Sequence, residues 1–265
     1  MPLARLLALS VLVAACAGPG RTLQADLAFV DLQARLAARA SAFEAHAGAF
    51  EVRGSRFNPD CSGFVEAVYE AEGVPLRRLM TLAAPRASSG VEAAFHAMER
   101  FGTVSRDASW PAPGDLVFFD DTYDRNGNGV PDDPLTHVGV VEWVEDGTVV
   151  FMHRGGRAVA RAAMTPGAPA VAASGERVLN SPLRDKRAAA SRAWRPDVLA
   201  GALFAAYGRL DPAKLPPDVS LDHAPGAAGA GGASAPSSAT CAAAAPKSSC
   251  ESRRTTGITA PAGSR

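Results

Sequence analysis

Cys61 stands where a cysteine can act as a nucleophile. It follows Asp60 and starts a run, CSGFVEAVYEA, whose apolar residues recur at helical spacing, so the sequence predicts a helix with Asp60 as its N-cap. Free N–H groups and the helix dipole favour an anion in the first turn, so we expect a lowered pKa for the Cys61 thiol. Ser62 and Gly63 are small, would leave room for a substrate backbone, and are predicted to line the substrate site. A buried structural cysteine is the alternative.

A nucleophilic cysteine needs a base, and two of the five histidines are candidates. His137 and His153 each border an apolar segment, and the two segments predict a β-hairpin. If residues 145–147 form a three-residue loop, His153 lies opposite Gly139 and both imidazoles project from one face of the sheet. A two-residue Asp-Gly turn would instead place them on opposite faces. On one face, His137 would take the thiol proton and His153 would orient its ring, as in a thiol-hydrolase triad.

The remaining histidines give weaker signals. His46 and His96 lie in alanine-rich helical segments and His223 lies near the C-terminus, so we expect ordinary surface or packing roles for them. One cysteine and two histidines could also bind zinc, but the sequence has no CxxC or HExxH spacing.

Periodic patterns around these residues predict one α+β domain over residues 27–212. Helices before strands favour this class over an alternating βαβ fold. Lys+Arg and Asp+Glu both number 27, so net charge gives no reason to expect nucleic acid as a partner. The expected elements are helices at 27–48, 61–72, 91–100 and 198–209, strands at 116–119, 137–144 and 148–153, and a loop at 54–59.

The N-terminal residues predict export and a lipid anchor. Residues 1–15 have the short apolar run of a secretory signal peptide, and Cys16 follows Val13-Ala14-Ala15 as in the bacterial lipobox, where the cysteine is acylated. Cleavage nearby with an unmodified Cys16 is the alternative. Residues 16–26 would then be a tether to the membrane. Ala17 replaces the aspartate that often signals inner-membrane retention, which favours the outer membrane, facing the periplasm.

The C-terminal residues 213–265 predict a disordered tail. They are dominated by Ala, Gly, Ser and Pro and hold almost no large apolar side chain. Cys241 and Cys250 lie within this tail, where either a passive disulfide or two free thiols fits the sequence.

The insert that precedes His137 has the spacing of a calcium-binding loop. In its D-x-N-x-N-G-x-x-D pattern the expected ligands are Asp124, Asn126, Asn128, the carbonyl of Val130, and Asp132. The pattern predicts a structural calcium ion that would fix the strand carrying the base. A polar surface loop without metal is the alternative.

Four segments together resemble the NlpC-type family of papain-like cell-wall peptidases. The resemblance covers roughly residues 30–160 in the family's order and rests on DCSGFV at 60–65, PGDLVFF at 113–119, HVGVV at 137–141 and FMH at 151–153. It implies a papain-like NlpC-type fold in which N-terminal helices pack on a small antiparallel sheet. It also implies hydrolysis of peptide bonds in peptidoglycan stem peptides, typically between D-glutamate and the diamino acid, with no cofactor for catalysis.

In that family's pattern Cys61 matches the nucleophile, His137 the base and His153 the third polar residue. Backbone N–H groups near Cys61 would hold the oxyanion. The family usually has a tyrosine before the Asp-Cys pair; the nearest counterpart here is Phe50, which lacks the hydroxyl and is kept as a candidate substrate-binding residue.

Two alternatives to the peptidase stay open. The closely related CHAP family shares the fold and the Cys–His pair and would imply an amidase. A catalytically inactive envelope lipoprotein that binds the cell wall would retain the fold without the chemistry.

Overall fold

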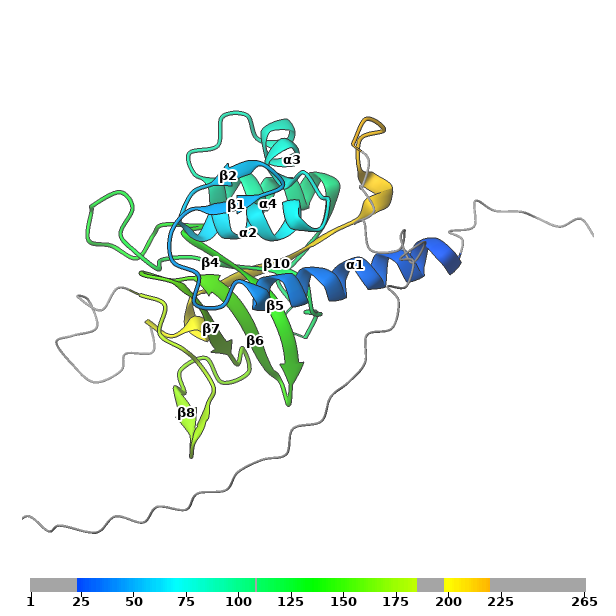
Figure 1. Cartoon of the computed structure of the whole chain (residues 1–265). Helices are drawn as coiled ribbons and strands as arrows, with labels where there is room; N and C mark the ends of the chain where they lie inside the picture. Colours follow the sequence, from blue (N-terminus) through cyan, green and yellow to red (C-terminus); the bar gives the residue numbers. More distant parts are fainter. Residues whose placement is uncertain (1–22, 108, 185–197, 220–265) are drawn as a thin grey trace, which may run out of the picture. The chain divides into compact units, whose positions relative to one another are not determined.

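The computed structural model describes residues 23–107, 109–184 and 198–219 (Figure 1). The predicted signal peptide and most of the predicted tail lie outside these residues, as do Cys16, Cys241, Cys250 and His223. Among the described residues, no helix is both long enough and apolar enough to cross a membrane. Val219 is buried in the core, so the packed chain extends beyond residue 212.

Helices come first along the chain and most strands come later, which confirms the predicted α+β class. The elements are α1 (Leu23–Ala42), β1 (Phe50–Val52), β2 (Ser55–Phe57), α2 (Cys61–Ala71), α3 (Leu76–Ala83), α4 (Gly90–Phe101), β3 (Gly102–Ser105), β4 (Leu116–Phe119), β5 (His137–Glu145), β6 (Thr148–Arg154), β7 (Val159–Met164), β8 (Ala173–Ser174), β9 (Arg177–Val178), α6 (Ala200–Leu203), β10 (Phe204–Leu210) and the 3-10 helix η2 (Pro212–Lys214).

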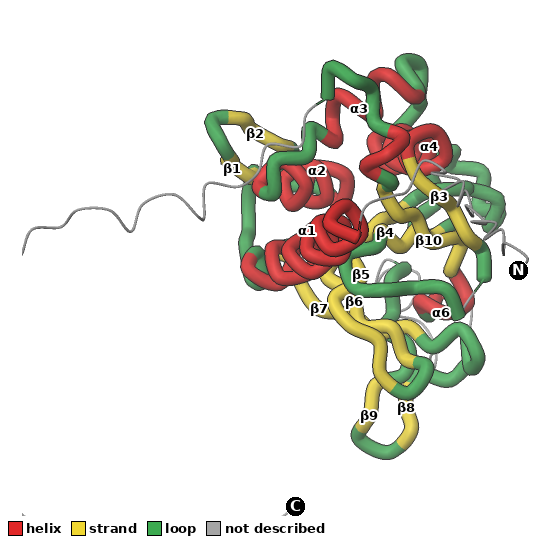
Figure 2. Tube along the Cα trace, turned by 90° about the vertical axis from the view of Figure 1, so that its right-hand side faces the viewer, coloured by secondary structure: helices red, strands yellow, loops and turns green. Residues whose placement is uncertain are grey.

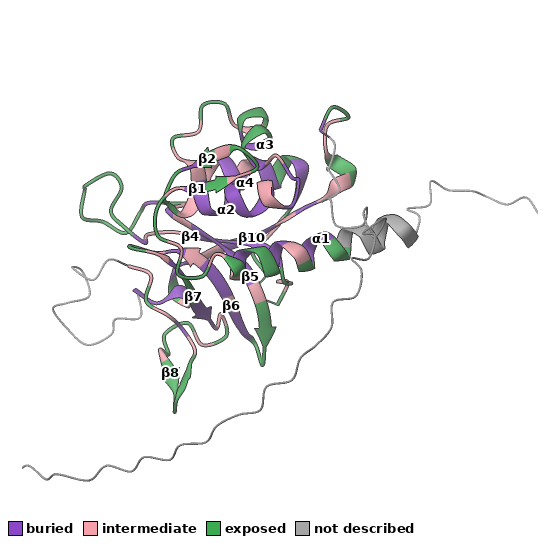
Figure 3. Cartoon of the chain, viewed as in Figure 1, coloured by how far each residue is buried: buried purple, intermediate pink, exposed green. Residues whose placement is uncertain are grey.

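Six strands form one antiparallel sheet in the order β3-β10-β4-β5-β6-β7, while β1–β2 and β8–β9 form two separate hairpins. Helices α1, α2 and α4 pack on one face of this sheet (Figure 2). The core between helices and sheet contains Phe64 from α2, Met98 from α4, and Val138 and Met152 from the sheet. Buried residues are accordingly concentrated in α2, α4 and the strands beneath them (Figure 3).

The other face of the sheet carries a second, smaller core. Val117, Phe119, Val141 and Phe151 pack there with Leu203 of α6. Residues of β4 alternate between the two cores, so all four are buried. This alternation places odd-numbered residues of β4 on the face away from the helices, which matters for the histidines of the neighbouring strands.

The predicted closing helix at 198–209 is wrong. Only Ala200–Leu203 is helical, and the chain then enters β10, which pairs with β3 on one side and β4 on the other. Tyr207 faces the smaller core while Ala206 and Leu210 face the helices. A strand that is buried on both faces has no polar face, and its apolar run cannot be distinguished from a buried helix by periodicity.

Near α1 the predicted boundaries shift because of long-range pairing. Helix α1 ends at Ala42, and the backbone N–H of Val159 at the start of β7 donates a hydrogen bond to the backbone oxygen of His46. The expected loop at 54–59 is partly a hairpin, because Arg53 and Gly54 both adopt positive φ angles and form a two-residue turn between β1 and β2.

Candidate functional site

The N-terminus of α2 is capped as the sequence predicts. Asp60 has an extended conformation, and its Oδ1 accepts hydrogen bonds from the backbone N–H of Gly63 at 2.7 Å and from the Ser62 hydroxyl at 2.8 Å. Cys61 is the first helical residue and is half-buried against the core. The cap therefore fixes the position from which the thiol projects.

The space beside Gly63 belongs to the protein and not to a ligand. A Cβ at residue 63 would lie 2.1 Å from the backbone oxygen of Asn58, so glycine is needed for the chain before α2 to pass close to the helix. The prediction that Gly63 leaves room for a substrate is corrected by this contact. Ser62 stays half-buried, with its hydroxyl on Asp60 and its side chain against Gly90.

The pKa of the Cys61 thiol is raised to about 11, so the predicted lowering is wrong. Burial is the largest cause, and the negative charge of Asp60 adds to it, while hydrogen bonds from the backbone of Val138, Ser62 and Cys61 itself act in the opposite direction. The removal of water around the thiol thus raises its pKa by more than the N-terminus of α2 lowers it. The sulfur also lies next to the peptide group between His137 and Val138.

The β5–β6 hairpin places both histidines on one face of the sheet, through a two-residue turn combined with a β-bulge. Asp146 and Gly147 have positive φ angles and form a two-residue turn, with Glu145 opposite Thr148. A bulge between Val141 and Trp143 then shifts the register by one residue. As a result His153 lies opposite Gly139, although the turn is the two-residue alternative, which in a regular hairpin would have placed the histidines on opposite faces.

The two imidazoles contact each other directly. Nε2 of His137 and Nδ1 of His153 are 2.8 Å apart, and either ring can donate this hydrogen bond, depending on the tautomer. The ring planes are nearly perpendicular, at 83°. Phe119 packs beside His137 and Phe151 beside His153, on the face of the sheet away from the helices.

Both histidines are held in the neutral form. Burial lowers the pKa of His153 to about 4, and burial together with the neighbouring His153 lowers the pKa of His137 well below its usual value. A neutral imidazole can accept a proton, as a base must. Since Nε2 of His137 is engaged with His153, Nδ1 is the nitrogen left for a thiol, and no residue in the described part of the chain is hydrogen-bonded to it.

The Cys61 sulfur lies near the backbone next to His137 but forms no hydrogen bond with either imidazole. The sulfur lies beside the Val138 amide, one peptide group away from His137. Cys61 and His137 are both among the described residues, and the thiol donates no hydrogen bond to the imidazole. Cys61 packs with the helix-side core, whereas both imidazoles lie beside Phe119 and Phe151 of the smaller core, so Sγ and Nδ1 must come closer before a proton can pass between them.

The remaining aromatic and histidine candidates are Phe50, His46 and His96, and each has a packing or hydrogen-bonding partner within the protein. Phe50 is fully buried and packs between His46 and Phe64, so its predicted substrate-binding role is corrected: its ring belongs to the core. His46 stacks on Phe50, in agreement with a packing role. His96 is more than half-buried on α4 and pairs with Glu99, a partner that the sequence analysis did not identify.

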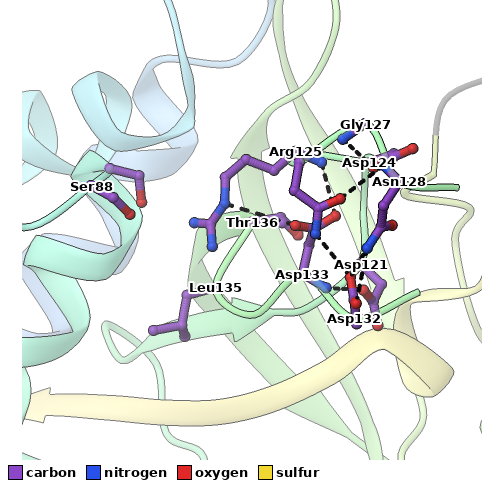
Figure 4. A network of polar contacts seen from close by, with 12 residues as sticks. Ser88, Asp121, Asp124, Arg125, Gly127, Asn128, Asp132, Asp133, Leu135 and Thr136 are labelled. Atoms are coloured by element: carbon purple, nitrogen blue, oxygen red, sulfur yellow. Dashed lines mark hydrogen bonds and ion pairs between the residues drawn. The ribbon is translucent and has the colours of Figure 1, made fainter. Parts of the chain in front are cut away.

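The insert before β5 is folded on itself (Figure 4). Oδ1 of Asp124 accepts the backbone N–H of Gly127 at 2.7 Å, and Gly129 has the positive φ angle expected at the sixth position of a calcium loop. The carboxylate of Asp132, however, accepts the side-chain N–H groups of Asn126 and Asn128. Within the described residues no group of three or more His, Cys, Asp or Glu side chains is placed to hold a metal ion, so calcium at this loop stays a prediction.

The sequence patterns did not identify two residues that are important to the site. Glu142 is the extra residue of the bulge that sets the histidine register, and Arg154 is a buried cation that directly follows His153. A bulge gives no local sequence signal here. Arg154 could have been noticed as a charged residue at the end of an apolar strand.

The chain matches no known protein-family model, no curated protein and no solved structure. We therefore infer the function from the geometry around Cys61 and from the sequence motifs that surround it.

Proposed function

We propose that the protein is a papain-like cysteine peptidase of the NlpC type that hydrolyses peptide bonds in peptidoglycan stem peptides. The observation that carries this proposal is a helix-capped cysteine whose sulfur lies beside the Val138 amide, next in sequence to His137, which forms a hydrogen-bonded pair of neutral imidazoles with His153. The α+β architecture, with helices on one face of an antiparallel sheet, is compatible with the papain-like fold that the motifs imply.

The reaction uses groups that the chain itself supplies, without a cofactor. Nδ1 of His137 takes the proton of the Cys61 thiol as the sulfur attacks the carbonyl carbon of the scissile amide. Backbone N–H groups at the start of α2 stabilise the oxyanion. The intermediate collapses, the amine leaves with the proton from His137, and a thioester remains. Water, deprotonated by His137, then hydrolyses the thioester and releases the acid.

The pKa shifts determine when the proton moves. With the thiol pKa at about 11 and the imidazole pKa values lowered, the resting pair is neutral and not a thiolate–imidazolium pair. Proton transfer therefore accompanies substrate binding or attack. His153 keeps the His137 ring in place through the 2.8 Å contact and stabilises the imidazolium that forms.

The proposed location follows from the N-terminal motif. Acylation at Cys16 would anchor the protein in a membrane, and the outer membrane facing the periplasm would bring the domain to the cell wall. Ser62 remains a candidate substrate contact in this proposal, and calcium at Asp124, Asn126, Asn128, Val130 and Asp132 a candidate structural ion.

A second candidate is a cell-wall-binding lipoprotein without catalysis. Two observations favour it: the raised pKa of Cys61, and the lack of a hydrogen bond between this thiol and His137 in the described structure. A CHAP-type amidase on the same scaffold is the remaining enzyme alternative.

Digestion of purified sacculi separates these functions. Wild type and Cys61→Ala are incubated with sacculi, and the released fragments are identified by mass spectrometry. Cleavage within the stem peptide by wild type alone supports the peptidase. Release of a peptide from the lactyl group indicates the amidase, and binding of both proteins without cleavage rules out the proposed chemistry.

A further inference from the structure

Arg154, the last residue of β6, is a buried cation. Its side chain is only 8% exposed, and Nη1 donates a hydrogen bond to the backbone oxygen of Gly155 at 2.7 Å. Nε is buried and has no partner. Within the described residues no carboxylate lies at ion-pair distance from this guanidinium, whereas the half-buried Arg209 is paired with Asp115 and Arg161 with Glu142.

Such a group requires an explanation, because removing a guanidinium from water is costly unless an anion and hydrogen bonds compensate. A buried polar atom without a hydrogen-bond partner indicates a functional role or a water, ion or ligand that binds there. Nη2 also lacks a partner in the described structure and is not among the atoms sealed from solvent, so it is the donor that a ligand can reach.

The sheet register places Arg154 next to the candidate catalytic residues. The β5–β6 ladder ends at the pair Gly139–His153, and Val138 and Arg154 are the next residues beyond this last pair on the two strands. The Val138 amide is the group beside the Cys61 sulfur. Gly155, whose backbone oxygen accepts the hydrogen bond from Nη1, also lies close to His153, because a Cβ at residue 155 would be 3.3 Å from Cε1 of that ring.

The chain that follows Arg154 is small and open to solvent at its second residue. Gly155 and Gly156 follow it directly, and the position of a Cβ at Gly156 has no neighbouring atom within 4 Å. Small residues beside a cation allow a substrate backbone to approach closely.

We propose that Arg154 binds a free carboxylate of the substrate peptide and so makes the site selective for acidic peptides. This inference rests on the proposed peptidase function and adds a specificity-determining residue to it. A carboxylate supplies the missing negative charge and accepts charge-assisted hydrogen bonds from the guanidinium, a geometry that arginine provides better than lysine. Arg154 is thus a specificity residue, while Cys61 and His137 carry the chemistry.

A matched pair of substrates tests this selectivity. The first is a short peptide with D-glutamate joined to a diamino acid and a free glutamyl α-carboxylate, and the second is its α-amide. We expect wild type to cleave the carboxylate peptide with a kcat/KM about 10- to 100-fold higher, the range for one charge-assisted contact. Equal kcat/KM values for both peptides would overturn the inference and leave the peptidase function intact.

Variants assign the selectivity to this residue. Arg154→Met should reduce the ratio of the two kcat/KM values to about one by lowering only the rate for the carboxylate peptide, and should not lower the unfolding midpoint because an unpaired buried charge is replaced by an apolar chain. Arg157→Met is the matched control, since Arg157 is exposed three residues later. A selectivity that survives in Arg154→Met contradicts the proposal. If that variant does not fold, Arg154→Lys, which keeps the charge but loses the planar fork, should show a reduced ratio.

A binding measurement covers the case in which wild type cleaves neither peptide. The unfolding midpoint of Cys61→Ala is then measured with each peptide, and again in the double variant with Arg154→Met. A midpoint shift given only by the carboxylate peptide, and lost in the double variant, supports the anion site although the peptidase function has failed. Equal shifts with both peptides, or none with either, refute the site.

Discussion

Deletion of Glu142 is predicted to leave the histidine pair intact, although it removes a residue from the middle of β5. Glu142 is the unpaired residue of the bulge between Val141 and Trp143. Without it, the strand becomes regular: Val141 still lies opposite Phe151, and Gly139 still lies opposite His153. If the hairpin instead had a regular strand and a three-residue turn, the same deletion would turn His137 to the opposite face.

The energetic cost of this deletion can be worked out from the contacts of Glu142. Its carboxylate accepts hydrogen bonds from Arg161 at 2.6 and 2.8 Å and from the Ser41 hydroxyl at 2.5 Å. An exposed ion pair contributes at most about 1 kcal/mol and a hydrogen bond about 1 kcal/mol, so the deletion should cost about 1–2 kcal/mol. For a domain of this size that lowers the unfolding midpoint by about 2–8 °C.

Deletion of Val141 is the matched control with the same chain length. It also removes the bulge, but it moves Glu142 into the position opposite Phe151, in the smaller core. Loss of a buried valine costs about 1.5–3 kcal/mol, and burial of a carboxylate adds to this. The total exceeds about 4 kcal/mol, a large part of the stability of a typical domain.

Thermal unfolding and 15N spectra of histidine-labelled protein measure both effects. In the Glu142 deletion the nitrogen shifts that report the His137–His153 hydrogen bond should match those of wild type. In the Val141 deletion the protein should be largely unfolded. Loss of the histidine signature in the Glu142 deletion, or equal stability of the two deletions, would refute the bulge as the element that sets the register.

Two further predictions concern the thiol and the insert. Because the thiol pKa is raised to about 11, alkylation of Cys61 by iodoacetamide, followed by mass spectrometry of its peptide, should accelerate steadily from pH 7 toward pH 11; a rate that is constant between about pH 5 and 8 would instead reveal a thiolate–imidazolium pair. If the insert binds calcium, millimolar calcium should raise the unfolding midpoint of wild type but not of Asp132→Asn. Equal midpoints of wild type in calcium and in chelator would contradict calcium binding.

The parts of the site that the sequence predicts are those set by neighbouring residues. The cap at Asp60, the start of α2 at Cys61, and the strands that carry His137 and His153 all follow from local patterns that the fold retains. The turn at Asp146-Gly147 also has a local signal, namely the Asp-Gly pair, but the sequence leaves two turn lengths open. The predicted face was right because the bulge compensates for the shorter turn.

The features that the sequence does not predict depend on contacts between distant segments. The raised pKa of Cys61 comes from burial by the assembled helices and sheet, which outweighs the local effect of the helix N-terminus. Gly63 is required because the backbone of Asn58 passes close to it, and the Phe50 ring packs against rings from two segments, Phe43 and His46 after α1 and Phe64 in α2. Apolar residues of β10 show a pattern that only the finished sheet explains.

The position of β10 between β3 and β4 has a kinetic consequence. Strands β3 and β4 are close in sequence, yet each pairs with β10, which lies more than eighty residues later, and not with the other. While the chain emerges from a ribosome or a translocation pore, the hairpins of β4 to β7 can form early, but β3 has no partner until residues 204–210 arrive. Such distant pairing slows folding, so an incompletely delivered chain exposes two unpaired strand edges to proteases and to other chains.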